Sequence, residues 1–228
     1  MPVRYEGVAE AWSERLGGPL PAEALRLLAA LPADAAEILQ DALRPAAPLT
    51  RDKLTGMLSR PVFDEALQHE VASAARHGAP SLLVADLDGL TSWMQAQGHL
   101  AGDLLVVRTG EILARSSRRS DLLGRLGVDQ LAVLLPRTDL VRGLVVARRV
   151  LARALADARA SERNRPGSTR ALPKLSVALG HLPKPGSVAD LLEVTDVALQ
   201  RARRAGGGVV EATRPEDQLI IEDSVRTA

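Results

Sequence analysis

The chain contains no cysteine and very few aromatic residues, with two tryptophans, one tyrosine and one phenylalanine in 228 residues. The lack of cysteine excludes disulfide bonds and metal sites built from thiolates. The scarcity of aromatic side chains argues against a surface on which successive nucleic-acid bases stack. Since 46% of the residues are hydrophobic, the chain can still bury a substantial core.

An excess of charge of one sign and a long apolar run are also missing. The chain has 29 basic and 28 acidic residues and a net charge of +1, so its overall charge predicts no nucleic-acid partner. No stretch approaches the roughly 20 consecutive apolar residues of a membrane helix, and the N-terminus lacks the charge-then-apolar order of a signal peptide. We expect a cytoplasmic protein that does not contact membranes.

Composition and breaker residues divide the sequence into three parts. Residues 1–48 carry leucines at helical spacing and end in a short Ala/Pro linker at residues 45–48; they predict a helical segment for dimerisation or partner binding. Residues 49–213 alternate helical and strand patterns and form the main domain. Residues 214–228 are charged and predict a flexible tail.

The pattern within the main domain predicts its architecture. Helices are expected at 60–77, 90–97, 100–116, 140–160 and 188–205, and strands at 81–85, 121–126, 131–136, 173–182 and 208–211. This order predicts an α+β sandwich, with helices covering a central, mostly antiparallel sheet.

Five sequence blocks resemble the GGDEF family, whose members are bacterial diguanylate cyclases that join two GTP molecules into cyclic di-GMP. The blocks are Asp52–Phe63, which begins Asp-Lys-Leu-Thr-Gly, Asp86-Leu87-Asp88, Gly98-His99-Leu100-Ala101-Gly102-Asp103, Leu175–Gly180 and Thr195–Arg203. Each is short, but they follow one another at the family's spacing. The family's signature corresponds here to Gly127-Val128-Asp129-Gln130-Leu131, between two strand-like runs.

The resemblance implies a site for GTP and Mg²⁺. In the family, acidic residues at the positions of Asp86 and Asp129 hold Mg²⁺ on the GTP phosphates, so we expect Mg²⁺ as an optional cofactor and none that is required. Asp103 would contact guanine, and Arg203 would replace a phosphate-facing lysine. Two alternatives stay open, because aspartate also favours turns: Asp86 would cap a strand-to-helix turn, and Asp129 would stabilise the hairpin.

Other positions of this site depart from the family pattern. Thr91, Met94, Val128, Gln130 and Gly207 replace a lysine, an asparagine, a glycine, a glutamate and an arginine, respectively. Positioning and charge stabilisation carry phosphoryl transfer, so these changes together predict a protein that is not an enzyme, with only a vestigial GTP site at Asp103 and Arg203. The run Arg201-Ala202-Arg203-Arg204 is expected to form a solvated helix face.

A second site of the family is retained in sequence. Many members carry Arg-x-x-Asp shortly before the signature, where cyclic di-GMP binds and inhibits the enzyme; here the motif is Arg118-Arg119-Ser120-Asp121. Arg149 falls where the family places a further arginine that contacts the ligand from a neighbouring subunit, and Arg148 is a substitute for it. The alternative is a surface ion pair between Arg118 and Asp121 at a helix end.

Two functional hypotheses follow. In the first, the protein is a cyclic di-GMP receptor that reads the ligand through Arg118, Asp121 and Arg149, forms a homodimer and relays the signal to a protein partner. In the second, it is a nucleotide-independent scaffold for protein–protein interaction. A change in melting temperature on adding cyclic di-GMP distinguishes them, because a ligand specific to the folded state raises it.

Overall fold

The computed structural model describes residues 50–163, 171–184 and 186–217. The predicted helical segment 1–48 lies outside these ranges, as do residues 218–228 of the predicted tail. Within the described ranges, no helix combines the length and apolar character that crossing a membrane requires.

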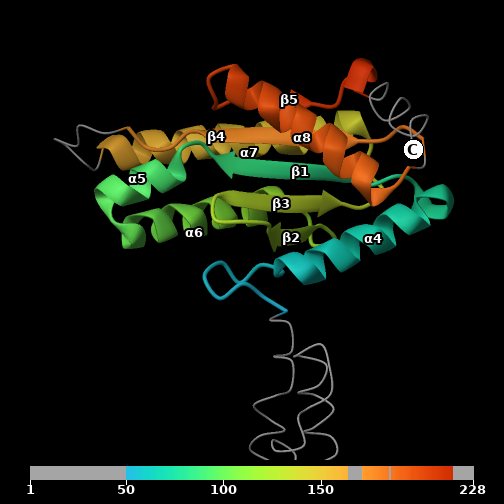
Figure 1. Ribbon diagram of the computed structural model, residues 1–228, viewed down its shortest axis with the longest axis horizontal. Coiled ribbons are helices and arrows are strands. Elements are labelled where there is room, and N and C mark those ends of the chain that lie inside the picture. Colours follow the sequence, from blue (N-terminus) through green and yellow to red (C-terminus); the bar gives the residue numbers. More distant parts are fainter. Residues whose placement is uncertain (1–49, 164–170, 185, 218–228) are drawn as a thin grey trace, which may run out of the picture. The chain divides into compact units, whose positions relative to one another are not determined.

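Five strands form a single sheet in the order β2-β3-β1-β4-β5 (Figure 1). They are β1 (Ser81–Leu87), β2 (Leu122–Arg125), β3 (Gln130–Leu135), β4 (Leu175–His181) and β5 (Val210–Ala212). All pairings are antiparallel except that of β4 with β5, which is parallel. The predicted α+β architecture with a mostly antiparallel sheet is therefore confirmed.

Five helices accompany the sheet in the described part of the chain. They are α4 (Arg60–His77), α5 (Leu90–Gln97), α6 (His99–Ser116), α7 (Leu140–Arg163) and α8 (Val188–Arg204). Figure 1 shows α8 in front of the sheet and α7 behind it. Both faces of the sheet are therefore covered, which explains why every residue of the central strand β1 is buried.

The side-chain alternation of the strands produces two separate cores. Leu83 and Ala85 of β1 belong to the cluster that contains Val106 of α6 and Val150 of α7. The residues that alternate with them along β1, Leu82 and Val84, belong to the other cluster, together with Phe63 of α4 and Leu191 of α8. Because successive residues of a strand point to opposite faces, one apolar strand supplies both cores.

The first residues of the predicted tail are held against the domain. The carboxylate of Asp217 is buried and accepts hydrogen bonds from the Arg201 guanidinium at 2.6 and 3.0 Å. Arg201 also donates to Glu211 at 3.3 Å. The expectation of a solvated face for the 201–204 run is therefore wrong at Arg201, because acidic residues from and beyond β5 fold back onto α8.

Candidate functional site

The sheet brings three acidic residues and one arginine around a cavity of about 390 Å³ beneath the signature turn, which we call the signature cavity. Asp86 and Asp88 come from the end of β1 and the turn after it, Asp129 from the β2–β3 turn and Arg203 from the last turn of α8. The complete lining is Asp86, Asp88, Gly89, Asp129, Arg203, Gly206 and Gly207. The predicted metal residues and Arg203 thus meet in one place, whereas Asp103 is not part of this lining.

Asp86 is the most buried charge of the signature cavity, with a side chain that is only 2% exposed. Its Oδ2 atom accepts a hydrogen bond from the Arg203 guanidinium at 2.5 Å and another from Gln130 Nε2 at 3.0 Å. Gln130 lies opposite Asp86 in the antiparallel pairing of β1 and β3. The next helix, α5, has Gly89 as its N-cap and no side-chain hydrogen bond at the cap, so the alternative in which Asp86 caps a strand-to-helix turn is wrong.

Electrostatic coupling extends over the whole cavity. The hydrogen bond to Asp86 raises the pKa of Arg203, and the charges of Asp86, Asp129 and Asp88 add to this effect. Burial raises the pKa of Asp88, helped by repulsion from Asp86 and opposed by a hydrogen bond from Ser176. The cavity therefore concentrates negative charge that Arg203 neutralises only in part.

The turn after Arg203 allows the backbone to approach Asp88. Gly207 has φ +72°, and a Cβ atom placed there would lie 2.2 Å from Asp88 Oδ2. A larger residue would therefore collide with the carboxylate and adopt an unfavourable backbone conformation. The glycine that replaces a family arginine here has a structural reason in this chain.

A partly buried ion pair between Arg125 and Asp52 lies beside the signature turn. One Arg125 guanidinium nitrogen lies 3.2 Å from both carboxylate oxygens of Asp52, and other nitrogens of Arg125 donate to the backbone carbonyls of Gly127 and Val128. Burial raises the pKa of Asp52, but the hydrogen bonds from Thr55 and the charge of Arg125 outweigh it and lower the pKa below 3.8. Sequence reasoning missed Arg125, although its place in the strand before the turn could have indicated this role.

The predicted guanine contact is the weakest part of the site. Met94 packs against Gly102 so closely that a Cβ atom on Gly102 would lie 2.2 Å from Met94 Cγ. Asp103 follows Gly102 on α6 and forms no hydrogen bond or ion pair within the described ranges. Guanine binding at Asp103 therefore has no supporting partner among the described residues.

The Arg-x-x-Asp motif forms a tight turn between α6 and β2. Asp121 is 8% exposed, and its Oδ2 atom accepts a hydrogen bond from the backbone N–H of Arg118 at 2.6 Å. The side chains of Arg118 and Arg119 are exposed, and neither forms a hydrogen bond or ion pair within the part of the chain that is described. The alternative of a surface ion pair between the side chains of Arg118 and Asp121 is therefore wrong.

Arg149 lies beside this turn on the same chain. Its guanidinium donates to the backbone carbonyl of Ser116 at 2.6 Å, two residues before Arg118. Arg148 is exposed and has no described partner. We call Arg118, Arg119, Asp121 and Arg149 the arginine turn.

A second cavity opens next to the arginine turn, with a volume of about 530 Å³. Asp121 and Arg119 line it, and Arg51 lines it from the segment before α4. Sequence reasoning did not select Arg51 or Arg119. Arg51 directly precedes the Asp-Lys-Leu-Thr block, and its position in the sequence does not indicate this role, because only folding brings that block next to α6.

The donor chemistry of the signature cavity suits Mg²⁺. This ion is commonly bound through one or two carboxylates and substrate phosphates, and Asp86 and Asp129 supply carboxylates to one cavity. Among the described residues, no group of three or more His, Cys, Asp or Glu side chains has the arrangement of a complete metal site. The residues therefore fit Mg²⁺ that arrives with a phosphate ligand, with Asp86 and Asp129 as its protein ligands.

Comparison with known proteins agrees with the fold and with the five sequence blocks. Residues 49–208 match the model of the family described as "Diguanylate cyclase, GGDEF domain". Diguanylate cyclase DgcP of Pseudomonas aeruginosa is 35% identical over 157 residues, which is 68% of this chain and 22% of DgcP. The probable diguanylate cyclase DgcC of Escherichia coli is 28% identical over 159 residues, or 69% of this chain and 41% of DgcC. This chain thus spans less than half the length of these curated relatives.

The chain is also similar to solved structures of GGDEF domains. The GGDEF domain of TpbB (YfiN) from Pseudomonas aeruginosa is similar with a TM-score of 0.62 and 28% identity, over 75% of this chain and 99% of that one. The GGDEF domain of DgcB from Caulobacter crescentus, solved in complex with cyclic di-GMP, has a TM-score of 0.62 at 24% identity, over 72% of this chain and 96% of that one. The second similarity supports the fold alone.

These matches overturn the expectation that the chain is not an enzyme. The family is described as a diguanylate cyclase family, and the named relatives DgcP and DgcC are diguanylate cyclases, one of them probable. The expectation relied on substitutions around the signature. These substitutions are indirect evidence, and the family match over most of the chain outweighs them. The chain belongs to the GGDEF domain family of diguanylate cyclases.

Proposed function

We propose that this protein acts in cyclic di-GMP signalling as a receptor that binds cyclic di-GMP at the arginine turn. The single observation that carries the proposal is the pairing of a buried, oriented carboxylate with exposed guanidinium groups. Asp121 is held by the backbone N–H of Arg118, while the guanidinium groups of Arg118 and Arg119 have no described partner. A ligand can bind these guanidinium groups without breaking an ion pair within the described part of the chain.

The chemistry of the arginine turn complements that of cyclic di-GMP. A guanidinium can stack on a guanine ring or form a forked contact with the O6/N7 edge or with a phosphate. Oδ2 of Asp121 is bonded to the Arg118 N–H, and Oδ1 has only a long contact of 3.5 Å with Ser120. Oδ1 is therefore the atom that would accept from the N1–H and N2–H groups of guanine.

Arg149 would supply an additional positive charge. Its contact with Ser116 uses one guanidinium nitrogen, so its other N–H groups can reach a ligand on the same chain or on a neighbouring copy. We propose that two chains form a homodimer in which Arg149, or Arg148 in its place, bridges the bound ligand between them. The GGDEF domain of DgcB, solved in complex with cyclic di-GMP, is similar to this domain in fold.

Titration calorimetry of the full chain with cyclic di-GMP tests the receptor proposal. Arg118→Ala should weaken binding about tenfold to a hundredfold, because hydrogen bonds to charged groups contribute about 1.5–3 kcal/mol. Asp121→Asn keeps an acceptor for the Arg118 N–H and should weaken binding through the loss of guanine recognition.

Arg76→Ala is the matched control, because Arg76 is an exposed arginine in the last turn of α4. It should leave the affinity unchanged. The absence of binding at high micromolar ligand, or equal affinity of the wild type and Arg118→Ala, would exclude the receptor proposal and favour the nucleotide-independent scaffold.

A second function is supported by the signature cavity, which we propose binds GTP with Mg²⁺ for the reaction of the diguanylate cyclase family. Asp86 and Asp129 would hold the ion, which when bound neutralises phosphate charge. Arg203 would move from Asp86 to a phosphate oxygen, since a guanidinium matches phosphate as well as carboxylate. GTP with Mg²⁺ should raise the melting temperature of the wild type but not of Asp129→Asn, and chromatography of the reaction would detect cyclic di-GMP.

We propose that ligand binding changes the assembly of the chain and that this change is relayed to a protein partner. A ligand with two guanines and two phosphates can join two chains, so cyclic di-GMP should change the number of chains per particle. Light scattering with and without the ligand measures this change. An identical mass in both conditions would remove the homodimer from the proposal and leave the ligand site in place.

A further inference from the structure

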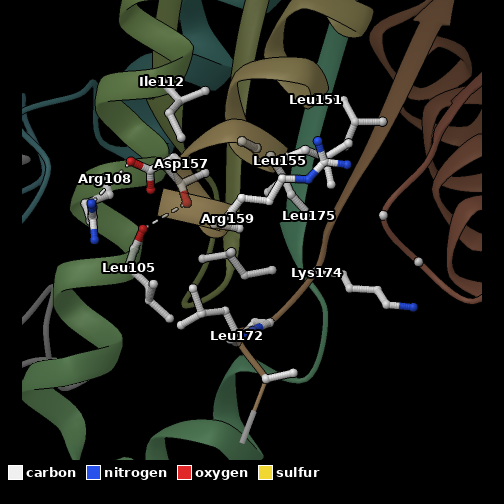
Figure 2. Close-up of a pocket in the computed structure, with 18 residues that line it drawn as sticks. Leu105, Arg108, Ile112, Leu151, Leu155, Asp157, Arg159, Leu172, Lys174 and Leu175 are labelled. Atoms are coloured by element: carbon white, nitrogen blue, oxygen red, sulfur yellow. Dashed lines mark hydrogen bonds and ion pairs between the residues drawn. The ribbon is translucent and has the colours of Figure 1, made fainter. Parts of the chain in front are cut away.

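A third cavity of about 450 Å³ lies between the facing sides of α6 and α7, next to the signature cavity (Figure 2). The segment before β4 and the glycine turn after α8 close its other sides, through residues 171–175 and Gly207-Gly208. Its volume is within the range of roughly 300–1,000 Å³ that is typical of small-molecule sites. None of the residues that form the arginine turn line it.

The interior of this cavity is apolar. Leu105 and Ile112 of α6 face Leu151 and Leu155 of α7, and Leu172 lies below them in Figure 2. Leu155 remains 43% exposed, which is high for a leucine beside a core. The hydroxyl of Thr109 also lines the cavity, but it donates to the Leu105 carbonyl at 2.8 Å and offers no free donor to a ligand. The interior therefore suits a hydrocarbon body.

The rim of the cavity is charged and has an excess of positive charge. Arg108 pairs with Asp157 at 3.2 Å, which neutralises both. Lys174 donates to the carbonyl of Gly206 at 2.8 Å and keeps its charge. Arg159 lines the cavity, is exposed and forms no hydrogen bond or ion pair within the described ranges.

We propose that this cavity binds a small amphipathic anion, with its apolar body between α6 and α7 and its carboxylate on Arg159. A free guanidinium next to an apolar interior provides one strong, oriented contact, whereas the leucines provide burial. A nucleotide fits less well, since the lining contains no aromatic ring and its neutral side-chain donor is already engaged. The proposal is independent of the function proposed above.

A ligand in this cavity should also affect the signature cavity, because the two cavities share a lining residue. Gly207 lines both cavities, and the backbone N–H of Asp88 donates to the carbonyl of Lys174 at 2.9 Å. A ligand between α6 and α7 would thus contact Lys174, whose backbone carbonyl binds the N–H of Asp88 in the acidic cluster. This position suits an effector of the domain.

Calorimetry of the full chain with decanoate, kept below its micelle concentration, tests the proposal, with decanol as the uncharged probe. Decanoate should bind, and decanol should bind at least about tenfold more weakly, because the carboxylate contact is lost. Arg159→Gln should reduce decanoate binding by a similar factor, whereas Arg163→Gln, at the end of the same helix and outside the lining, should leave it unchanged.

A pair of tryptophan variants tests the location. Ala158→Trp places a large side chain in the cavity and should abolish decanoate binding, whereas Ala156→Trp, on the exposed side of α7, should not. Circular dichroism establishes that both variants are folded. No decanoate binding to the wild type, equal binding of decanol and decanoate, or undiminished binding in Ala158→Trp would each overturn the proposal.

Discussion

The signature cavity and the arginine turn use the same residue types in opposite ways. In the signature cavity, the buried carboxylate of Asp86 is engaged by Arg203 and Gln130. In the arginine turn, Asp121 is held by a backbone N–H, while the guanidinium groups of Arg118 and Arg119 face solvent. Charges that satisfy one another stabilise the fold, and charges left without partners are available to a ligand.

The largest expected effect follows from removing the arginine of the signature cavity. Arg203→Ala leaves the 2%-exposed carboxylate of Asp86 with Gln130 as its remaining partner. The free energy of unfolding should fall by about 1.5–3 kcal/mol, the contribution of a hydrogen bond to a charged group. Urea unfolding measures it, and Arg204→Ala, an exposed neighbour without a described partner, should change it by less than about 0.5 kcal/mol. Equal effects of the two variants would contradict the account.

The ion pair beneath the signature turn should have a smaller, pH-dependent effect. Asp52→Asn should cost about 1 kcal/mol at neutral pH, because the pair with Arg125 is lost. The folded-state pKa of Asp52 is lowered, so its contribution is complete above about pH 3.8 and is lost as the pH falls through the lowered value. Unfolding at pH 7 and pH 3 checks this. A difference between variant and wild type that persists at pH 3 would argue against it.

Removing the charge of Asp88 should change the free energy of unfolding in the opposite direction to Asp52→Asn. Its pKa is raised mainly by burial, so its ionised form disfavours the folded state once the pH exceeds the raised value. Asp88→Asn should therefore stabilise the protein at pH 7 by roughly a few tenths of a kcal/mol. This gain should vanish as the pH falls towards 3.8, the ordinary value. Thermal unfolding across this pH range measures it, and a loss of stability at pH 7 would show that the Ser176 hydrogen bond dominates instead.

The smallest expected effect belongs to the arginine turn without ligand. Arg118→Ala should change the free energy of unfolding by less than about 0.5 kcal/mol, because the guanidinium has no described partner and the backbone N–H that Asp121 binds is retained. A loss comparable to that of Arg203→Ala would mean that both regions stabilise the fold, and the distinction between them would disappear.

The sequence predicted the fold more fully than the site. Strand alternation and helical spacing predict all ten described elements, because these periodicities are local. The bond between Arg203 and Asp86 joins residues 117 positions apart, and only the packing of α8 against β1 creates it. Likewise, Arg201 belongs to a basic run that predicts a solvated face, and its acidic partners come from residues after the helix. The cavity between α6 and α7 depends on how leucines pack, which no spacing reveals.

Hydrogen exchange by mass spectrometry, with and without cyclic di-GMP, tests the central distinction most directly. The account predicts slower exchange around residues 116–121, where the ligand would cover the Arg118 N–H bonded to Asp121, and little change around residues 127–131. Protection confined to the signature turn and to the neighbourhood of Asp86, with unchanged exchange at 116–121, would contradict it.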